Sequence, residues 1–401
     1  MGVTHHPEPW LAALGGPVRR KRMCEALGGQ QMRAAVVRVA GGPFLIENVK
    51  LGSLKPTEVL VRVVATGVCH TDMVVRNQDF TTPLPMILGH EGSGIVEAVG
   101  TDVTTIKLGD HVVMTYMSCG LCDTCESGHP AHCEYMGPLN FGGARLDGSS
   151  GVTDREGGEL HDHFFGQSAF AEYALASERN VVRVPKDVPL ELMGPLGCGI
   201  QTGAGSVLNA LNVHAGSSFV AFGAGAVGLS AIMAAKVAGA TTIIAADLNE
   251  ARLALALELG ATHVINSASE DPVARVREIT QKGADFTLEC SGRGAVLRQA
   301  IDCLGIFGVC GIVGATKEGT EVAFNVNDVM IPGRRIMGIV QGDVVAKTFI
   351  PVLVDLYKQG RFPFDRLVRF YDFAEINQAV EDSERGVAIK PILRIAAASD
   401  A

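Results

Sequence analysis

The sequence has little that would place the protein in a membrane or on nucleic acid. In its 401 residues no uninterrupted apolar run reaches the roughly 18 residues that a membrane span needs. The formal net charge is −9 and no long basic run occurs, which argues against binding to nucleic acid or to an anionic membrane surface. There is no internal repeat and no Pro-rich or Ser-rich linker. What is present is an ordinary globular composition, 47% hydrophobic and 19% charged, long enough for about two or three domains.

The N-terminal segment lacks the pattern of a secretory signal, which is an apolar core followed by a small-residue cleavage site. Its few Arg and Lys are a weak hint of a transit peptide. Strand-like sequence begins only at Met32, with MRAAVVRVA, so we expect residues 1–31 to be a disordered leader. Ten cysteines without an export signal indicate a reducing compartment, the cytoplasm, where clustered cysteines usually bind metal.

Four of the ten cysteines are clustered in CGLCDTCESGHPAHC, residues 119–133. Their spacing, C-x2-C-x2-C-x7-C, points successive thiolates at one centre and leaves no ligand position open. Four soft sulfur ligands are typical of a structural zinc site. An iron–sulfur cluster would accept the same thiolates, and free buried cysteines are a third reading. The predicted structural-zinc ligands are Cys119, Cys122, Cys125 and Cys133.

A glycine-rich turn follows a short apolar strand in SSFVAFGAGAVGLSAIMAAKVAGATTIIAAD. Residues 219–222 predict a buried strand, a helix then runs to about Gly239, and residues 241–246 predict a second strand. The intervening G-x-G-x-x-G is typical of dinucleotide binding, because its glycines let the backbone approach a pyrophosphate at the helix N-terminus. The alternative is a tight turn in a parallel sheet that binds nothing. The predicted cofactor residues of the turn are Gly223, Gly225, Val227 and Gly228.

An acidic residue stands at the end of the second strand. Asp247 follows the last of these glycines by nineteen residues, the place of the acid that accepts hydrogen bonds from the adenosine ribose hydroxyls. Its charge would repel a 2′-phosphate and so favours NAD over NADP, although the nearby Arg252 weakens that preference. Further strands at 285–290 and 306–314, with a helix near 294–303, indicate a parallel sheet covered on both faces.

Three other stretches carry polar residues inside apolar, strand-like sequence: VVATGVCHTD, LGHEGSGIVEAVG and PLGCGIQTGAG. Each has a plain structural reading when it is taken alone. Cys69 would be a small buried hydrophobe, His90 a hydrogen-bonded turn histidine and Cys198 a core residue.

Together these stretches resemble one family, the zinc-dependent medium-chain alcohol dehydrogenases. The motif GHEGxGxVxxVG, the four-cysteine lobe (residues 119–133) and the glycine-rich turn occur in that family's order, and the resemblance runs from about Met32 to Ile395. Within the family, HDHFFGQSAFAEYAL and PLGCGIQTGAG are most similar to aryl-alcohol (benzyl-alcohol) and geraniol dehydrogenases.

The resemblance implies a catalytic zinc with three protein ligands, Cys69, His90 and Cys198. A fourth position then stays free for water or substrate, as in other catalytic zinc sites. Glu91 matches a carboxylate that approaches zinc during ligand exchange. Asp72 matches the acid that orients the zinc-bound imidazole.

The resemblance also implies a path for the proton that the alcohol loses. Thr71 matches the hydroxyl that takes this proton. Many relatives carry a histidine three residues later that passes the proton towards solvent, but here that residue is Val74. We therefore expect the relay to end at the cofactor ribose hydroxyl, with water or another group completing it.

Two domains are implied, with two zinc ions and one NAD per chain. A discontinuous, β-rich, GroES-like catalytic domain would span 32–201 and 343–397. A Rossmann domain with a doubly wound parallel sheet, 202–342, would lie between its two parts. Relatives are dimers or tetramers, so we expect a homodimer or homotetramer with 321–342 as the pairing edge. The implied cofactor contacts are Thr202 and Val313 at the nicotinamide ring, and His70 and Lys390 at the pyrophosphate.

Two more histidines, His161 and His163, lie in the glycine-rich segment 142–166. They are candidates for the border of a substrate entrance, but we expect a solvated loop there.

The function that the resemblance implies is reversible NAD-dependent oxidation of a primary aromatic or allylic alcohol to its aldehyde. Polyols and S-hydroxymethyl thiol adducts are alternative substrates for the same scaffold. A non-catalytic NAD-binding redox sensor is a further alternative, although such a protein would be expected to have lost metal ligands. The expected partner is a small alcohol or aldehyde, with no nucleic acid and no membrane.

Overall fold

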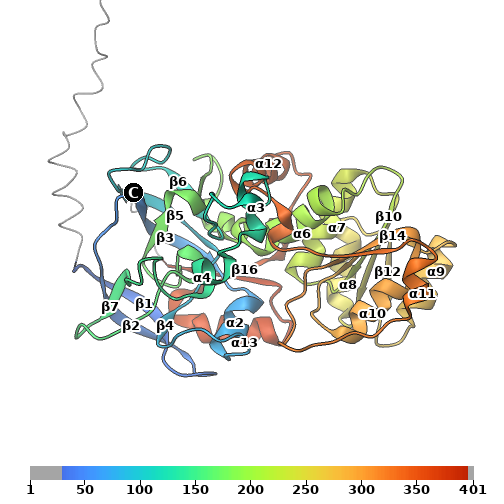
Figure 1. Ribbon diagram of the computed structural model, residues 1–401, viewed down its shortest axis with the longest axis horizontal. Helices are drawn as coiled ribbons and strands as arrows, with labels where there is room; N and C mark the ends of the chain where they lie inside the picture. Colours follow the sequence, from blue (N-terminus) through green and yellow to red (C-terminus); the bar gives the residue numbers. More distant parts are fainter. Residues whose placement is uncertain (1–28, 396–401) are drawn as a thin grey trace, which may run out of the picture.

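Three β-sheets organise the described part of the chain into two halves that lie side by side (Figure 1). The computed structural model describes residues 29–395. Gly29 already belongs to the fold, because its N–H donates a hydrogen bond to the carbonyl of Leu51 at 2.7 Å. The prediction of a disordered leader is therefore wrong for residues 29–31, and the rest of that segment lies outside the described residues.

The half built from residues 218–338 contains a parallel sheet of six strands. Their order is β12-β11-β10-β13-β14-β15, so the direction of winding reverses between β10 and β13. Such a switch point opens a crevice at the carboxyl ends of the two strands, where ligands bind in this architecture. The parallel sheet predicted from the sequence is confirmed. The strands are β10 (Ser218–Phe222), β11 (Thr242–Asp247), β12 (His263–Asn266), β13 (Ala284–Glu289), β14 (Leu304–Ile312) and β15 (Arg335–Gly338).

Helices cover both faces of this sheet (Figure 1). Alternate side chains of β10 point to opposite faces of the sheet. Phe219 packs in the core beneath α7, and Val220 packs in the core beneath α9 and α10. The helix after the glycine-rich turn ends where Gly239 adopts a φ of +85°, which glycine does without steric strain. These helices are α7 (Ala226–Ala238), α8 (Glu250–Leu259), α9 (Pro272–Thr280), α10 (Gly294–Asp302) and α11 (Val326–Met330).

The other half is mainly antiparallel. One sheet has the order β4-β1-β2-β7, and a second has the order β16-β17-β3-β5-β6-β9, with β8 paired to β3. Because β16 and β17 come from the C-terminal end of the chain, this half is discontinuous, although the domain boundaries at 201/202 and 342/343 stay predictions. The strands are β1 (Gln31–Val37), β2 (Phe44–Leu51), β3 (Glu58–Gly67), β4 (Met86–Ile87), β5 (Gly92–Val99), β6 (His111–Met114), β7 (Val152–Asp154), β8 (Tyr173–Ser177), β9 (Val181–Arg183), β16 (Val368–Asp372) and β17 (Lys390–Arg394).

The remaining helices are short or lie where the chain passes between the halves. The chain enters the parallel half through α6 and leaves it through a one-turn 3-10 helix, η7 (Gln341–Asp343), which contacts α6. Within residues 29–395 no helix has both the length and the apolar character needed to cross a bilayer. The other helices are α2 (His70–Arg76), α3 (Asp123–Glu126), α4 (Met136–Phe141), α5 (Leu190–Met193), α6 (Gly199–Gly205), α12 (Ala346–Lys358) and α13 (Ile376–Glu384).

A buried group of charged residues fixes the segment that precedes Phe164. His163 Nε2 lies 3.4 Å from Glu58 Oε1, its Nδ1 lies 2.7 Å from Asp162 Oδ1, and Arg145 Nε lies 2.6 Å from Glu58 Oε1. Burial alone would lower the pKa of His163, but Asp162 and Glu58 raise it to about 9. Burial also opposes the charge on Glu58, yet His163 and Arg145 lower the pKa of that carboxyl to about 2. The expectation of a solvated loop is therefore wrong at His163, which is a buried cation.

We expect His163→Asn to remove a pH-dependent part of the stability. Because the pKa of His163 rises from 6.5 to about 9 on folding, its stabilising contribution is complete below pH 6.5 and is lost as the pH rises through 9. The stability gap between wild type and variant should therefore shrink by about 3 kcal/mol between pH 6 and pH 9.5. Asn is chosen because it tolerates the φ of +59° at this position. Urea unfolding followed by circular dichroism measures the gap, and a gap independent of pH would contradict the assignment.

Candidate active site and metal centres

Helix α2 begins next to a predicted metal ligand. Cys69 precedes the helix in extended conformation, and its N–H donates a hydrogen bond to Asp72 Oδ2 at 2.9 Å. The other oxygen of this fully buried carboxylate accepts a hydrogen bond from Gly89 N at 3.1 Å. Thr71 Oγ1 lies 3.9 Å from Cys69 Sγ. The start of the helix thus holds a thiol, a hydroxyl and a buried acid together.

His90 lies between β4 and β5 and is completely buried. Its Nδ1 lies 2.9 Å from Asp72 Oδ1, so the carboxylate favours a proton on Nδ1 and leaves Nε2 with a free lone pair. The imidazole stacks on Phe165 with ring centroids 4.4 Å apart and an interplanar angle of 25°. Nε2 has no hydrogen-bond partner among the described residues. A buried nitrogen in this state is suited to bind a metal ion.

Cys198 brings a second thiol to His90 from the start of α6. The sulfurs of Cys69 and Cys198, a ring nitrogen of His90 and a Glu91 oxygen all lie within 4.8 Å of one another. A hydrogen bond from Cys198 holds the pKa of Cys69 well below its usual value; burial opposes this shift, and the charge of Lys390 adds to it. A thiolate, a second thiol and an imidazole nitrogen are donors that zinc prefers, so the three predicted ligands fit this metal.

Glu91, directly after His90, is bound to a cation from far along the chain. Lys390 Nζ lies 2.8 Å from both carboxylate oxygens and 3.2 Å from Val68 O. Gly199 N donates a further hydrogen bond to Glu91 Oε1 at 3.1 Å. Burial alone would lower the pKa of Lys390, but the Glu91 carboxylate raises it well above its usual value. Lys390 is paired with Glu91 in this structure. Its contact with a pyrophosphate stays a prediction.

The four thiols of the four-cysteine lobe also converge on one point. The sulfurs of Cys119 and Cys125 are 4.0 Å apart and those of Cys122 and Cys133 are 3.9 Å apart. Four sulfurs at about 2.3 Å from a tetrahedral zinc would be about 3.8 Å apart, whereas an iron–sulfur cluster would hold them farther apart. This set therefore fits one zinc ion.

The glycine-rich turn lies between β10 and α7. Gly223 has a φ of +102°, which strains any residue with a side chain, and Gly228 has no room for one, because its Cβ would lie 1.8 Å from the Gly223 carbonyl oxygen. A Cβ on Gly225 would meet nothing within 4 Å, so the backbone there faces open space at the helix N-terminus. Val227 follows in the first turn of α7. The turn fits the pyrophosphate of a dinucleotide.

Asp247 ends β11 beside this turn. Its Oδ2 accepts a hydrogen bond from Ala224 N at 2.6 Å and its Oδ1 accepts one from Asn249 N at 2.9 Å, so each oxygen keeps a lone pair for a ribose hydroxyl. Arg252 Nε is buried without a hydrogen-bond partner among residues 29–395. Three other predicted cofactor residues lie elsewhere: Thr202 is buried in α6, Val313 follows β14, and His70 is exposed at the start of α2. Their contacts with the cofactor stay predictions.

Three further side chains contact the predicted ligands and were missed in the sequence. Phe165 stacks on His90, and Gln167 Nε2 donates a hydrogen bond to the His90 carbonyl at 3.0 Å. Both lie in HDHFFGQS, a stretch whose family likeness marked it as important. Gln341 Nε2 donates to Cys198 Sγ at 3.5 Å across a separation of 143 residues, and no local pattern identifies it.

Comparisons with known proteins agree with this geometry. Residues 55–186 match the family model for an alcohol dehydrogenase GroES-like domain, and residues 226–359 match the model for a zinc-binding dehydrogenase. A geraniol dehydrogenase from Castellaniella defragrans is 47% identical over 363 residues, 90% of this chain and 97% of that protein. The chain belongs to the zinc-dependent medium-chain alcohol dehydrogenases. It is an oxidoreductase of that family, whose domains imply zinc and a nicotinamide cofactor.

Solved structures of dehydrogenases have the same fold over nearly the whole chain. A benzyl alcohol dehydrogenase from Acinetobacter calcoaceticus has a TM-score of 0.89 and 53% identity, and the match covers 92% of this chain and 100% of that one. An alcohol dehydrogenase zinc-binding domain protein from Burkholderia ambifaria has a TM-score of 0.90 and 59% identity, with 92% and 99% covered.

We expect Asp72→Asn to weaken metal binding at His90 by about 10- to 100-fold, because the amide no longer holds the proton on Nδ1 as a carboxylate does. The measurement is competition with a chromogenic zinc chelator. Asp79→Asn is the matched control, since Asp79 is exposed just beyond the same helix. Equal zinc retention in both variants would contradict the role of Asp72.

Proposed function

We propose that the protein is a zinc- and NAD-dependent dehydrogenase that oxidises primary benzylic or allylic alcohols reversibly to their aldehydes. The observation that carries the proposal is the unpartnered Nε2 of His90, buried beside the sulfurs of Cys69 and Cys198. Three such donors are typical of a catalytic zinc with one position left for the substrate. A second zinc in the four-cysteine lobe would have four protein ligands and a structural role.

The residues around the metal ligands would hold and orient them. When bound, the zinc ion supplies Lewis-acid polarisation of the substrate oxygen and the nicotinamide supplies a hydride acceptor. Asp72 keeps the His90 imidazole in the tautomer with the proton on Nδ1. Phe165 covers one face of the ring and excludes water from it.

Thr71 would take the proton that the alcohol loses, because its hydroxyl lies beside the Cys69 sulfur. Val74, one turn further along α2, has no group that binds a proton. The proton would therefore pass from Thr71 to the ribose hydroxyl of the cofactor or to water.

Aromatic side chains support the proposed substrate class. Phe80, which is 47% exposed, contacts Phe141 with centroids 4.6 Å apart, and Phe141 contacts Phe165 at 5.2 Å. Phe165 in turn stacks on His90, so a series of rings leads from the surface to the metal ligands. Such a surface favours flat, unsaturated alcohols. The names of two relatives, a geraniol dehydrogenase and a benzyl alcohol dehydrogenase, agree with this choice.

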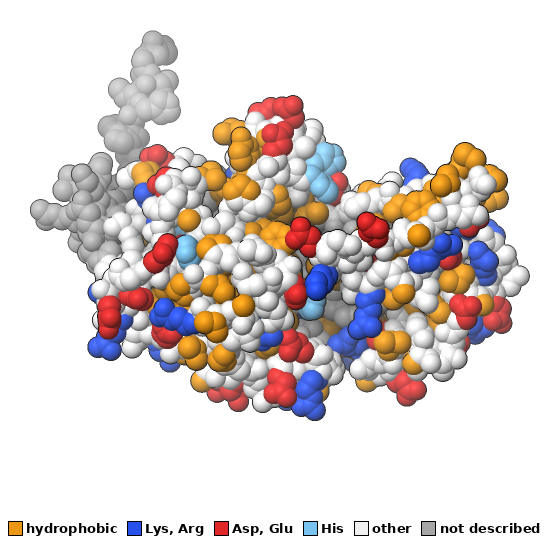
Figure 2. Space-filling model, turned by 60° about the horizontal axis from the view of Figure 1, so that its bottom comes forward, with side chains coloured by type: hydrophobic (Ala, Val, Ile, Leu, Met, Phe, Trp, Pro, Cys, Tyr) orange, Lys and Arg blue, Asp and Glu red, His pale blue; other side chains and the backbone are white. Residues whose placement is uncertain are grey.

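NAD is the proposed cofactor because Asp247 stands where the adenosine ribose would lie. Figure 2 shows the surface hollowed between the two halves, with Lys and Arg side chains at its margins, which would attract an anionic dinucleotide. The cytoplasmic location stays a prediction.

We expect NAD⁺ reduction with benzyl alcohol and geraniol to exceed that with ethanol, a polyol or an S-hydroxymethyl thiol adduct. Cys69→Ser should lower turnover below detection while NAD binding is retained, because the variant loses a metal ligand but leaves the glycine-rich turn unchanged. The absorbance of NADH measures turnover, and a fluorescence titration with NADH measures cofactor binding. Near-normal turnover of Cys69→Ser would contradict the zinc mechanism, and a preference for the thiol adduct or polyol would contradict the substrate class.

We also propose a homodimer or homotetramer joined through the parallel sheet. β15 is the edge strand of that sheet, and an edge strand presents unpaired N–H and C=O groups. Apolar side chains gather near it, at the right-hand end of the molecule in Figure 2. The exposed fractions are 74% for Ile306, 74% for Phe307, 67% for Val326, 65% for Met330 and 77% for Ile331. An apolar patch of this kind marks an interface.

Ile331→Asp should shift the protein from oligomer towards monomer, because a charge would have to be buried at the interface. Leu146→Asp is the matched control, since Leu146 is 70% exposed in the other half of the molecule. Native mass spectrometry reports the state of each protein. A monomeric wild-type protein would contradict the proposed assembly.

A further inference from the structure

The 3-10 turn η7, where the chain leaves the parallel half, has an unusual backbone. Its three residues all have positive φ: +51° at Gln341, +71° at Gly342 and +50° at Asp343. Residues other than glycine rarely adopt this region, and they persist there when surrounding contacts over-determine the conformation. The contacts that hold these three residues therefore indicate what the turn does.

On its inner side the turn contacts a predicted ligand of the catalytic metal. Gln341 is 7% exposed; its Nε2 donates a hydrogen bond to Cys198 Sγ at 3.5 Å, and its Oε1 accepts one from Gln201 Nε2 at 2.9 Å. Gly342 lies so close to α6 that a Cβ would be 2.7 Å from the Gln201 carbonyl oxygen and from Gly205 Cα. Because α6 begins directly after Cys198, the turn and the ligand form one packed unit.

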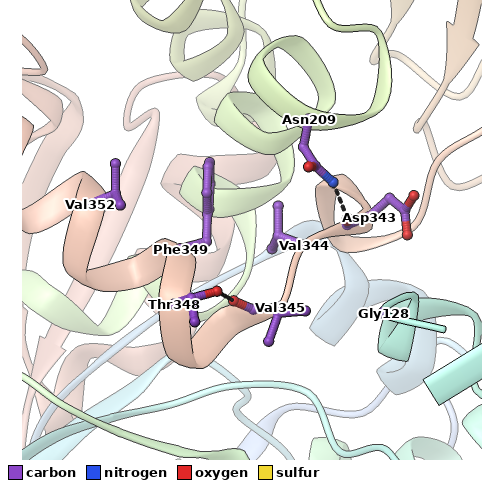
Figure 3. A pocket seen from close by; sticks show the side chains of 8 residues that line it. All are labelled: Gly128, Asn209, Asp343, Val344, Val345, Thr348, Phe349 and Val352. Atoms are coloured by element: carbon purple, nitrogen blue, oxygen red, sulfur yellow. Dashed lines mark hydrogen bonds between the residues drawn. The ribbon is translucent and has the colours of Figure 1, made fainter. Parts of the chain in front are cut away.

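On its outer side the turn is bound to the four-cysteine lobe. The two carboxylate oxygens of Asp343 lie 2.8 and 2.9 Å from His129 Nδ1, which stands between the third and fourth cysteines of the lobe. His132 Nε2 is farther away, at 4.0 Å. Asn209 on the other side donates a hydrogen bond to the Asp343 carbonyl, and the Asp343 carboxylate points away from it (Figure 3).

Side chains do not fill the space on the outer side of the turn. A surface hollow of about 300 Å³ lies beside Asp343, lined also by Gly128 of the lobe and by Val345 and Phe349 of the following segment (Figure 3). Because side chains do not fill this space, polar contacts help to fix the turn on this side, and the contact between His129 and Asp343 is the shorter of the two that the lobe's histidines make.

We propose that Gln341 is a positioning residue for Cys198 and that the contact between His129 and Asp343 holds Gln341 in place, so that the four-cysteine lobe fixes the orientation of a catalytic metal ligand. The inference rests on the proposed function for the metal role of Cys198. It gives the lobe, which has no open ligand position, a physical connection to the chemistry. The connection runs from His129 through Asp343 and Gln341 to the sulfur of Cys198.

The test is the rate at which iodoacetamide alkylates Cys198 in the purified holoenzyme, measured by peptide mass spectrometry with metal content determined in parallel. In Gln341→Asn the new side chain tolerates positive φ but is too short to reach the sulfur. Because the hydrogen bond to Cys198 is lost, alkylation should be about tenfold faster. His129→Ala should speed it about two- to fivefold, because the variant loses a hydrogen bond to Asp343 from a half-exposed side chain. His129→Asn, whose amide still donates to Asp343, should restore the wild-type rate.

His132→Ala is the matched control, a second histidine of the lobe too far from Asp343 for a hydrogen bond, and it should leave the rate unchanged. Unchanged alkylation in Gln341→Asn or in His129→Ala would overturn the proposal. So would a His129→Ala protein whose four lobe cysteines react faster, since His129 would then support the lobe itself. If the wild-type protein holds no metal at Cys198, the proposed function fails. The alkylation rates of the Gln341 and His129 variants, compared with wild type, would still test whether the lobe positions Cys198.

Discussion

The buried imidazole of His90 is the constraint on which the rest of the site depends. Asp72 holds one nitrogen, Phe165 covers one face, and the other nitrogen has no hydrogen-bond partner among the described residues. A buried polar atom without a partner is costly, and few are found in folded proteins. Two cysteine sulfurs within 4.8 Å suggest the reason for this one, since a metal ion bound by the three groups would satisfy them together.

The fold brings these groups together from segments that are far apart in the sequence. Cys69 precedes α2 and His90 precedes β5 in the β-rich half, whereas Cys198 stands at the start of the helix that leads into the parallel half. The three ligands therefore come from distant segments of the β-rich half, and Cys198 stands where the chain leaves that half. Strand β17, from the C-terminal end, pairs with β3 and adds Lys390 beneath Glu91.

The parts of this structure that were predictable are those encoded locally. The glycine-rich turn could be identified because Gly223 and Gly228 meet steric demands within one strand–turn–helix unit. The candidate metal ligands could be selected because their motifs resemble those of a known family, and the structure brings them together in two clusters. Lys390 could not be assigned to Glu91, since 299 residues separate them and either role suits a buried lysine. Gln341 could not be identified either, because its importance lies in a positive φ and a long-range contact that leave no pattern in the sequence.

The ion pair between Glu91 and Lys390 decides how many ligands the site offers. A Glu91 oxygen lies within 4.8 Å of the three ligand atoms, so a free carboxylate would compete for the position that a substrate needs. Lys390 binds both of its oxygens at 2.8 Å and Gly199 N binds one of them, which restrains the carboxylate away from that position. If both cysteines lost their protons on binding a divalent ion, their two charges would balance it, and no further negative ligand would be required. With both oxygens held by Lys390, we infer that Glu91 would leave three donors, Cys69, His90 and Cys198, for a bound zinc ion.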